Sequence, residues 1–323
     1  MAKAALKVEN VSEVGNKVIN EVEKAIVGKS KLIEKVMAAA LSGGHVLLED
    51  FPGLGKTLLA KSFAISLGLD FKRIQFTPDL LPSDITGGYI YNRSKNEFEL
   101  RKGPIFANII LADEINRASP KTQSALLEAM EEGQVTLEGE TMKLPQPFMV
   151  IATQNPIEYE GTFPLPEAQL DRFIVKLAVG YPSTEEEREI LRKRRQRGKD
   201  EVELKKVTKA KELLEMRAAV EKVYIDPDVE QYIINLVRRT RNDGQVAVGA
   251  SPRGSLALLK LTRAWAALNG RDYVLPDDVK TFADPVLVHR LILKPDLWLK
   301  KNASSEVIAG ILNSVAVPVL QDA

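Results

Sequence analysis

The sequence predicts an α/β domain with a parallel sheet, followed by a domain made of helices. An apolar run at His45–Glu49 leads through a glycine-rich loop into a helical pattern at Leu58–Leu67. Further apolar runs at Asn108–Ala112 and Phe148–Thr153 end in polar side chains, as buried parallel strands do. After Gly180–Ser183 the strand patterns give way to helical ones.

The length of 323 residues is enough for two domains, which we place at residues 1–180 and 181–323. The helical patterns of the second domain are Glu185–Arg197 with Thr184 as its cap, Thr208–Val223, Asp226–Arg241, Ser251–Asn269 and Asp277–Arg290. We expect Trp265 and Trp298 in its core. The basic run Arg192–Arg197 is open to a nucleic-acid contact, but acids precede and follow it, which favours a solvated helix and loop.

The composition excludes several classes of protein. Lys and Arg number 45 and Asp and Glu 44, so no overall field attracts nucleic acid or an anionic membrane. The absence of cysteine excludes disulfides, thiolate metal sites and thiol nucleophiles, and two histidines argue against a zinc site. No apolar run approaches the roughly 18 residues of a membrane span, and no secretion signal opens the chain. We therefore expect a cytoplasmic protein without a membrane span.

The glycine-rich loop nearly matches the phosphate-binding pattern G-x-x-x-x-G-K-[ST]. It ends in Gly55, Lys56 and Thr57, but Asp50 stands where the first glycine belongs. A short side chain that tolerates turn geometry is expected to replace a glycine that mainly eases the turn. A strand before the loop and a helix after it let backbone N–H groups cradle phosphates, with Lys56 on the β- and γ-phosphates and Thr57 on Mg²⁺. The residues expected at the nucleotide are Pro52, Gly53, Leu54, Gly55, Lys56, Thr57 and Leu58.

Two acids follow the next apolar run. Asp113 and Glu114 stand where a parallel strand delivers side chains to the carboxyl edge of its sheet. Asp113 can take Mg²⁺ through water, and Glu114 can orient and deprotonate an attacking water. Such a pair often only caps a helix, but the preceding phosphate loop favours the catalytic interpretation.

Three further side chains admit a functional and a plain interpretation. Asn155 either holds the hydrolytic water or starts a turn with Pro156. Arg253 follows Ser251, so it lies near a helix N-terminus, where a cation opposes the helix dipole unless an anion is close; the plain alternative is a solvated arginine. Arg117 is either an interface cation or a surface charge.

Two hairpins are predicted beside the core pattern. One pairs Gly87–Tyr91 with Glu97–Arg101, and the other alternates from Val135 to Leu144 around Glu138–Glu140. The core does not need them, so they either contact a partner or are decoration.

Together the motifs resemble one family. The carrying segments are Glu49–Thr57, Ala112–Ala118, Ala152–Pro156 and Leu165–Phe173. They are similar to the MoxR family of AAA+ ATPases, of the helix-2 insert clade, in which an acidic residue before the loop is common. The resemblance extends from Ile26–Lys29 to Ser251–Ser255.

The resemblance implies a P-loop AAA+ core with a five-stranded parallel sheet, followed by an all-helical lid domain. It implies that Val27 and Gly28 flank the adenine, that Asn155 is sensor 1 and that Arg253 is sensor 2. Without the resemblance, Arg172 would be interpreted as a surface charge. The resemblance implies that it is the arginine finger, which reaches a neighbour's γ-phosphate. The hairpins become the helix-2 insert and the pre-sensor-1 hairpin, which project from a ring face.

The function implied is hydrolysis of ATP with Mg²⁺ by a homo-oligomeric, hexameric ring that remodels or activates a protein client. The family is associated with partners bearing von Willebrand factor A domains. We expect Lys56 and Arg253 to serve one pocket and Arg172 to point toward a neighbour. The alternatives are a nucleic-acid motor, which the near-zero charge disfavours, and a small-molecule kinase or a nucleotide switch without turnover.

Overall fold

The computed structural model describes residues 7–155, 161–300 and 302–319. Its centre is a parallel sheet of five strands in the order β2-β5-β8-β1-β9. The strands are β1 (Val46–Glu49), β2 (Phe71–Gln75), β5 (Ile109–Asp113), β8 (Met149–Gln154) and β9 (Val175–Leu177). The predicted α/β fold class with its parallel sheet is therefore confirmed. Pro156, expected just after β8, lies outside the described residues, as do the outer limits of the two predicted domains.

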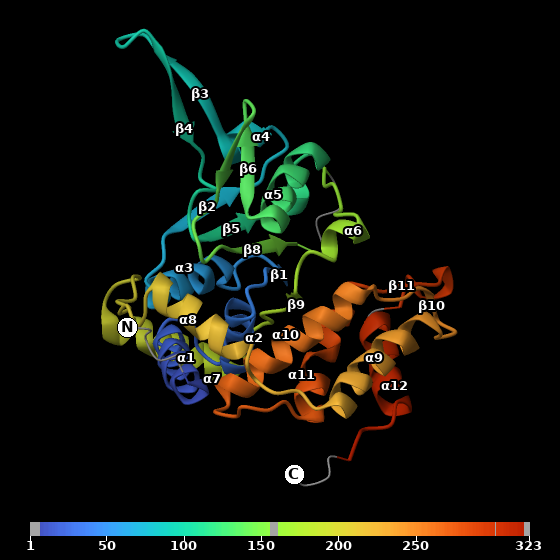
Figure 1. Cartoon of the computed structure of the whole chain (residues 1–323). Helices are drawn as coiled ribbons and strands as arrows, with labels where there is room; N and C mark the ends of the chain where they lie inside the picture. The colour runs from blue at the N-terminus through green and yellow to red at the C-terminus, as the bar shows by residue number, and fades with distance from the viewer. Residues whose placement is uncertain (1–6, 156–160, 301, 320–323) are drawn as a thin grey trace, which may run out of the picture.

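Both faces of the sheet are buried, which explains the continuous apolar runs in the sequence. Leu47, Ile110 and Val150 pack on the face covered by α4 (Pro82–Thr86) and α5 (Pro120–Glu132). Their strand neighbours pack on the opposite face, because successive side chains of a strand alternate. That face is covered by α1 (Val8–Glu23), α2 (Ser30–Leu41) and α3 (Lys56–Leu67), as Figure 1 shows.

The second half of the chain is helical, as predicted. Its helices are α7 (Thr184–Arg197), α8 (Ala210–Val220), α9 (Pro227–Arg241), α10 (Pro252–Leu268), α11 (Pro276–Leu287) and α12 (Ala303–Ser314). This half also contains two short paired strands, β10 (Val246–Val248) and β11 (Ile292–Leu293), and the short helix η2 (Pro295–Leu297). The short helices of the first half are η1 (Ile115–Arg117) and α6 (Glu167–Leu170). Helix α10 packs against α1 and α2, so one apolar core joins the helical half to the sheet. The division at residue 180 falls between β9 and α7 and stays a prediction.

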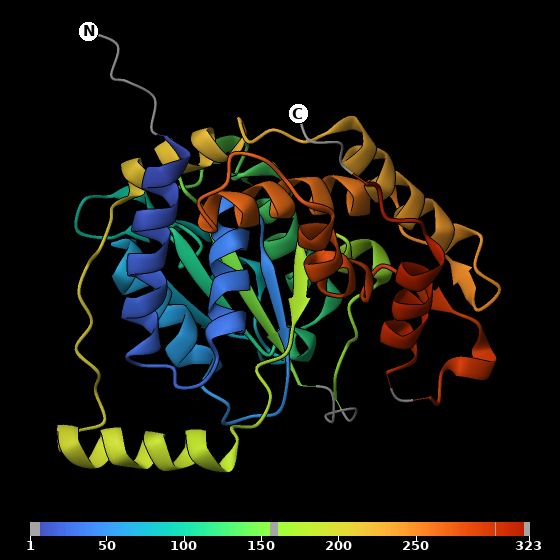
Figure 2. The ribbon, with the colours of Figure 1, turned by 90° about the horizontal axis from the view of Figure 1, so that it is seen from below.

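Helix α7 stands apart from the other helices (Figure 2). Each of its residues is described, and none is buried. Its cap is Ser183 rather than Thr184: the Ser183 Oγ accepts from the Glu186 N–H at 3.2 Å, and Thr184 is already helical. Arginines of the basic run pair with Glu189 and Asp200, which fits the solvated interpretation.

The two tryptophans differ from each other. Trp265 packs edge-on against Phe282 with ring centroids 5.4 Å apart, within the expected core. Trp298 is 68% exposed, so its assignment to the core was wrong. Its indole Nε1 donates to the Leu293 carbonyl at 2.8 Å, which satisfies the only polar group of an otherwise exposed ring.

The two predicted hairpins are present and project away from the helical half (Figure 1). They are β3 (Gly87–Asn92) with β4 (Glu97–Lys102), and β6 (Gln134–Leu137) with β7 (Glu140–Lys143). The Tyr89 hydroxyl donates to the Glu140 carboxylate at 3.0 Å and links them. Phe98, Ile90 and Tyr91 on the first hairpin are exposed, so apolar surface lies far from either core.

His45, at the start of β1, is buried and held neutral. Its Nδ1 accepts from the Val150 N–H at 2.9 Å, and its Nε2 lies 3.1 Å from the Met130 carbonyl oxygen, to which it donates. Burial lowers the pKa of His45 from 6.5 to about 4, and the charge of Arg217 adds to this. A second proton would have to displace the Val150 hydrogen bond.

This histidine predicts a loss of stability in acid. Between pH 6.5 and about 4 the unfolded chain binds a proton at His45 and the folded chain does not. The free energy of unfolding should therefore fall by about 3 kcal/mol over this window and recover as pH rises. Denaturant melts of the parent and of His45→Gln across these pH values test it. Equal slopes in the two proteins would contradict the assignment. His289, whose pKa burial also lowers, should contribute to the slope that remains in both.

Across the described ranges, no helix has the length and apolar character needed to cross a membrane.

Candidate functional site

The glycine-rich loop lies between β1 and α3 at the carboxyl edge of the sheet. Gly53 and Gly55 have φ of 82° and 80°, a region that favours glycine. A Cβ added to either would meet no atom of the described residues within 4 Å, so both face open space. Helix α3 begins at Lys56, directly after the loop, so the N–H groups of its first turn lie beside the loop. The loop thus forms a cradle of the shape and polarity that suit a phosphate.

The loop opens into a cavity of about 390 Å³, a size that suits a small ligand. Its lining residues are Pro52, Gly53, Gly55, Lys56, Thr57, Leu58, Arg73, Asp113, Glu114 and Asn155. The loop, the two acids and Asn155 therefore share one cavity, as their order along the strands predicts. Leu54 was expected there but is not among the lining residues, and Arg73 was not expected.

Lys56 is docked on its own loop. Its Nζ donates to the carbonyl oxygen of Asp50 at 2.6 Å and to that of Phe51 at 3.2 Å. These carbonyls hold the ammonium group at the mouth of the cradle. A phosphate in the cradle would compete with them for the same charge.

Asp113 is held by three donors. Arg73 donates to Oδ2 from Nε at 3.0 Å and from Nη2 at 2.6 Å. The Thr153 hydroxyl donates to Oδ1 at 2.7 Å. The carboxylate is thereby fixed at the end of β5, facing the loop cavity.

Glu114 is positioned by its neighbours on both sides. Its backbone has a φ of 57°, and its N–H donates to the Thr153 hydroxyl at 2.8 Å. The Gln75 amide donates to Oε2 at 2.8 Å, and the Arg117 Nε lies 3.1 Å from the same oxygen. Arg117, left open above, thus contacts the acid expected to act as base.

Arg73, Gln75 and Thr153 were not among the site residues expected from the sequence. Arg73 and Gln75 lie two apart on β2, so they share a side of that strand, and Gln75 pairs with Asp113 in register. Ile74 and Phe76 alternate with Arg73 and Gln75, which offered a weak strand signal. Which strand β2 joins, and therefore what its polar residues meet, is not readable from that pattern.

Val27 and Gly28, expected at the adenine, lie beside the linker that follows β9. A Cβ on Gly28 would meet the Glu186 side chain of α7. The adjacent Lys29 donates from Nζ to the Tyr181 carbonyl at 3.0 Å. Neither Val27 nor Gly28 is among the described residues that line the loop cavity, so their adenine role stays a prediction.

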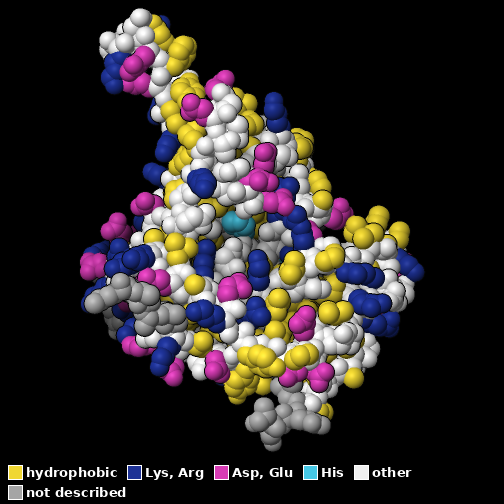
Figure 3. Space-filling view, in the orientation of Figure 1, with side chains coloured by type: hydrophobic (Ala, Val, Ile, Leu, Met, Phe, Trp, Pro, Cys, Tyr) yellow, Lys and Arg dark blue, Asp and Glu magenta, His cyan; other side chains and the backbone are white. Residues whose placement is uncertain are grey.

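Arg172 and Arg253 lie close to each other and away from the glycine-rich loop. Both pair with Glu131: the Arg172 Nη2 lies 3.0 Å from Oε2 and the Arg253 Nη2 2.5 Å from Oε1. They line a separate cavity of about 270 Å³, together with Lys260 and Arg290. Figure 3 shows Lys and Arg side chains along the hollow between the two halves. Arg253 does not line the cavity that Lys56 lines, so the expectation that the two serve one pocket stays a prediction.

A half-buried carboxylate links the two segments that carry these arginines. Asp171, next to Arg172, accepts from the Ser251 hydroxyl at 2.8 Å and from the Arg290 Nε at 2.7 Å. The Arg290 side chain is only 2% exposed. Ser251 caps α10, which carries Arg253, so its hydroxyl joins the start of that helix to the segment before β9.

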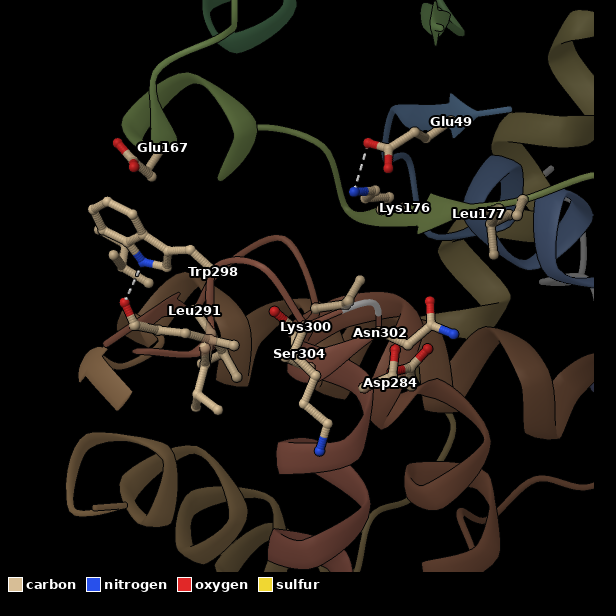
Figure 4. A pocket seen from close by; sticks show the side chains of 17 residues that line it. Glu49, Glu167, Lys176, Leu177, Asp284, Leu291, Trp298, Lys300, Asn302 and Ser304 are labelled. Carbon is tan, nitrogen blue, oxygen red and sulfur yellow. Dashed lines mark hydrogen bonds and ion pairs between the residues drawn. The ribbon is translucent and has the colours of Figure 1, made fainter. Parts of the chain in front are cut away.

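A larger cavity than these two lies elsewhere, between the β1–β9 edge and the helical half (Figure 4). It measures about 620 Å³ and contains the ion pair of Glu49 with Lys176 at 2.6 Å. Its described lining includes none of the residues that the sequence assigned to the site. Cavity volume alone would therefore have pointed away from the cavity at the glycine-rich loop.

Comparison with known proteins agrees with the geometry. The family model described as "ATPase family associated with various cellular activities" matches residues 45–175, and an AAA lid domain model matches residues 238–311. The chain is 49% identical to Uncharacterized protein YeaC of Bacillus subtilis over 98% of both chains. It is 45% identical to Chaperone MoxR1 of Mycobacterium tuberculosis over 93% of this chain and 81% of that protein. A crystal structure of a candidate ATPase from Cytophaga hutchinsonii superposes with a TM-score of 0.90 at 43% identity, covering 97% of each chain. The chain belongs to the MoxR family of AAA+ ATPases.

Proposed function

We propose that this protein hydrolyses ATP with Mg²⁺ and couples the turnover to remodelling, maturation or activation of protein clients. The observation that supports this most is the single cavity shared by the phosphate cradle, Lys56, both acids and Asn155. Those groups supply charge, metal ligands and a base on one face of a bound triphosphate.

Each group has a separate task in this proposal. Lys56 leaves the carbonyl oxygens of its loop and binds the β- and γ-phosphates. Thr57 and Asp113 would hold Mg²⁺, and the ion would supply positive charge that offsets the charge developing on the phosphates. Glu114 takes a proton from the attacking water, which Asn155 helps to hold. The donor set fits the metal, because hydroxyl and carboxylate oxygens are the ligands Mg²⁺ prefers.

The active species that we propose is a ring of this chain, six copies in number. Arg172 and Arg253 lie together outside the loop cavity. In a ring, both would reach the γ-phosphate held by a neighbouring copy and stabilise charge there. This replaces the expectation that Arg253 acts within its own subunit.

Protein clients are proposed for the projecting hairpins. The β3–β4 hairpin presents Ile90, Tyr91 and Phe98 to solvent, as a client-binding surface would. The name of the relative Chaperone MoxR1 supports a client role. A partner with a von Willebrand factor A domain is the class we propose, on the family resemblance alone.

The experiment that tests hydrolysis is phosphate release from ATP and Mg²⁺ with no acceptor added. Steady release of phosphate and ADP is the expected result. A kinase would need an acceptor, and a switch would stop after one equivalent. In parallel, addition of duplex DNA at low salt should leave the rate unchanged, because the formal net charge of the chain is only +1.

A further inference from the structure

The residue that breaks the phosphate-loop pattern has its own contacts. Asp50 is only 6% exposed. Its Oδ1 accepts from the Phe51 N–H at 2.8 Å, and its Oδ2 accepts from the Gly180 N–H at 2.5 Å. A glycine at this position has no side chain to make either bond. The expectation that Asp50 only eases a turn is therefore wrong.

The backbone of Asp50 contacts the lysine of the cradle. Its carbonyl oxygen accepts from the Lys56 Nζ at 2.6 Å. Its N–H donates to the Gln154 carbonyl at 3.1 Å, next to Asn155. One residue thus touches the phosphate-directed ammonium group, the loop backbone and the segment after β9.

The segment after β9 is attached to the loop at several points and leads directly to α7. The Tyr181 ring stacks on Phe51 with centroids 5.7 Å apart. The Lys29 Nζ donates to the Tyr181 carbonyl and lies 3.6 Å from Glu186 in the first turn of α7. None of the residues of α7 is buried, so the helix is not held by packing into a core. The contacts of Tyr181 and Glu186 therefore help to position its N-terminal end.

We propose that Asp50 couples occupancy of the phosphate cradle to residues 178–187, which comprise the linker after β9 and the first turn of α7. The inference rests on the proposed function, because it requires ATP in the cradle. ATP draws Lys56 away from the Asp50 carbonyl and orders the loop. One side-chain oxygen of Asp50 accepts from the Phe51 N–H of the loop, and the other accepts from the Gly180 N–H. Because Asp50 joins them in this way, the loop and Gly180 then move and become ordered together. Asp50 is a positioning residue and touches no phosphate.

Hydrogen exchange of the whole protein with and without Mg²⁺ and ATP tests this coupling. In the parent, ATP should slow exchange about threefold or more in two segments, residues 51–58 and residues 178–187. Asp50→Gly should keep ATP affinity within a few-fold and keep the protection of 51–58. It should lose the ATP-dependent protection of 178–187. Asp50→Asn, which keeps the shape but only one acceptor oxygen, should give an intermediate loss.

The controls separate this proposal from the proposed function. Glu49→Gln alters the adjacent carboxylate, which pairs with Lys176 and not with the linker, so it should behave as the parent. If the parent binds ATP but 178–187 does not respond, or if Asp50→Gly responds like the parent, the coupling is refuted and the nucleotide site stands. A roughly hundredfold loss of ATP affinity in Asp50→Gly, about 2.7 kcal/mol, would also refute it, because Asp50 would then act in binding. If the parent binds no ATP, it is the proposed function that fails.

Discussion

Replacing Glu114 with glutamine is expected to lower ATP turnover by about 10²–10⁴-fold while leaving ATP bound. Glutamine keeps the size of the side chain and an oxygen that can accept from Gln75 and Arg117, so the local geometry survives. What is lost is the base, which acts only on the attacking water. Lys56→Ala is expected to abolish ATP binding instead, because Lys56 supplies charge to the phosphates in the ground state.

The two variants should therefore separate rate from affinity. ATP binding measured by calorimetry and phosphate release measured on the same samples give both quantities. Parental turnover in Glu114→Gln would show that the base is another group. Tight ATP binding by Lys56→Ala would show that the loop is not the phosphate site.

Arg172→Ala is expected to lower turnover by about 10³-fold with little change in ATP affinity. Arg172 lies outside the cavity that Lys56 lines, and in the proposed ring it would act on charge that develops at a neighbour's γ-phosphate. Arg192→Ala is a matched control, since Arg192 pairs with Glu189 on the exposed helix α7. That control should retain parental turnover.

Mixing subunits adds a sharper test of the same arginine. Arg172→Ala keeps an intact cradle, and Lys56→Ala keeps an intact Arg172. At a mixed interface the first can supply the cradle and the second the arginine, so the mixture should recover activity that neither variant has alone. A mixture as inactive as its components would argue that Arg172 acts within its own chain or on folding.

Features set by neighbouring residues could be predicted from the sequence. The loop, the two acids and the hairpins follow from the order of residue types along a few positions, and the structure places them as expected. The caps of α9 and α10 also follow locally, because Asp226 and Ser251 accept from N–H groups two residues on.

Features that depend on residues far away in the sequence could not be predicted from it. Asp50 was interpreted as a turn residue because its partner Gly180 lies 130 positions away. Arg253 was expected beside Lys56, but where its side chain lies depends on how α10 packs, and here it pairs with Glu131. Arg73 and Gln75 were missed for the same reason, since their role begins only when β2 pairs with β5.

The central claim is that one copy of the chain holds ATP while another supplies arginine to it. The most direct measurement is specific ATPase activity across a dilution series, with sedimentation mass recorded at each concentration. We expect specific activity to rise with concentration and to level off where the mass reaches that of a ring. A monomer that is fully active at the lowest concentration would contradict the claim and would remove Arg172 from the catalytic residues.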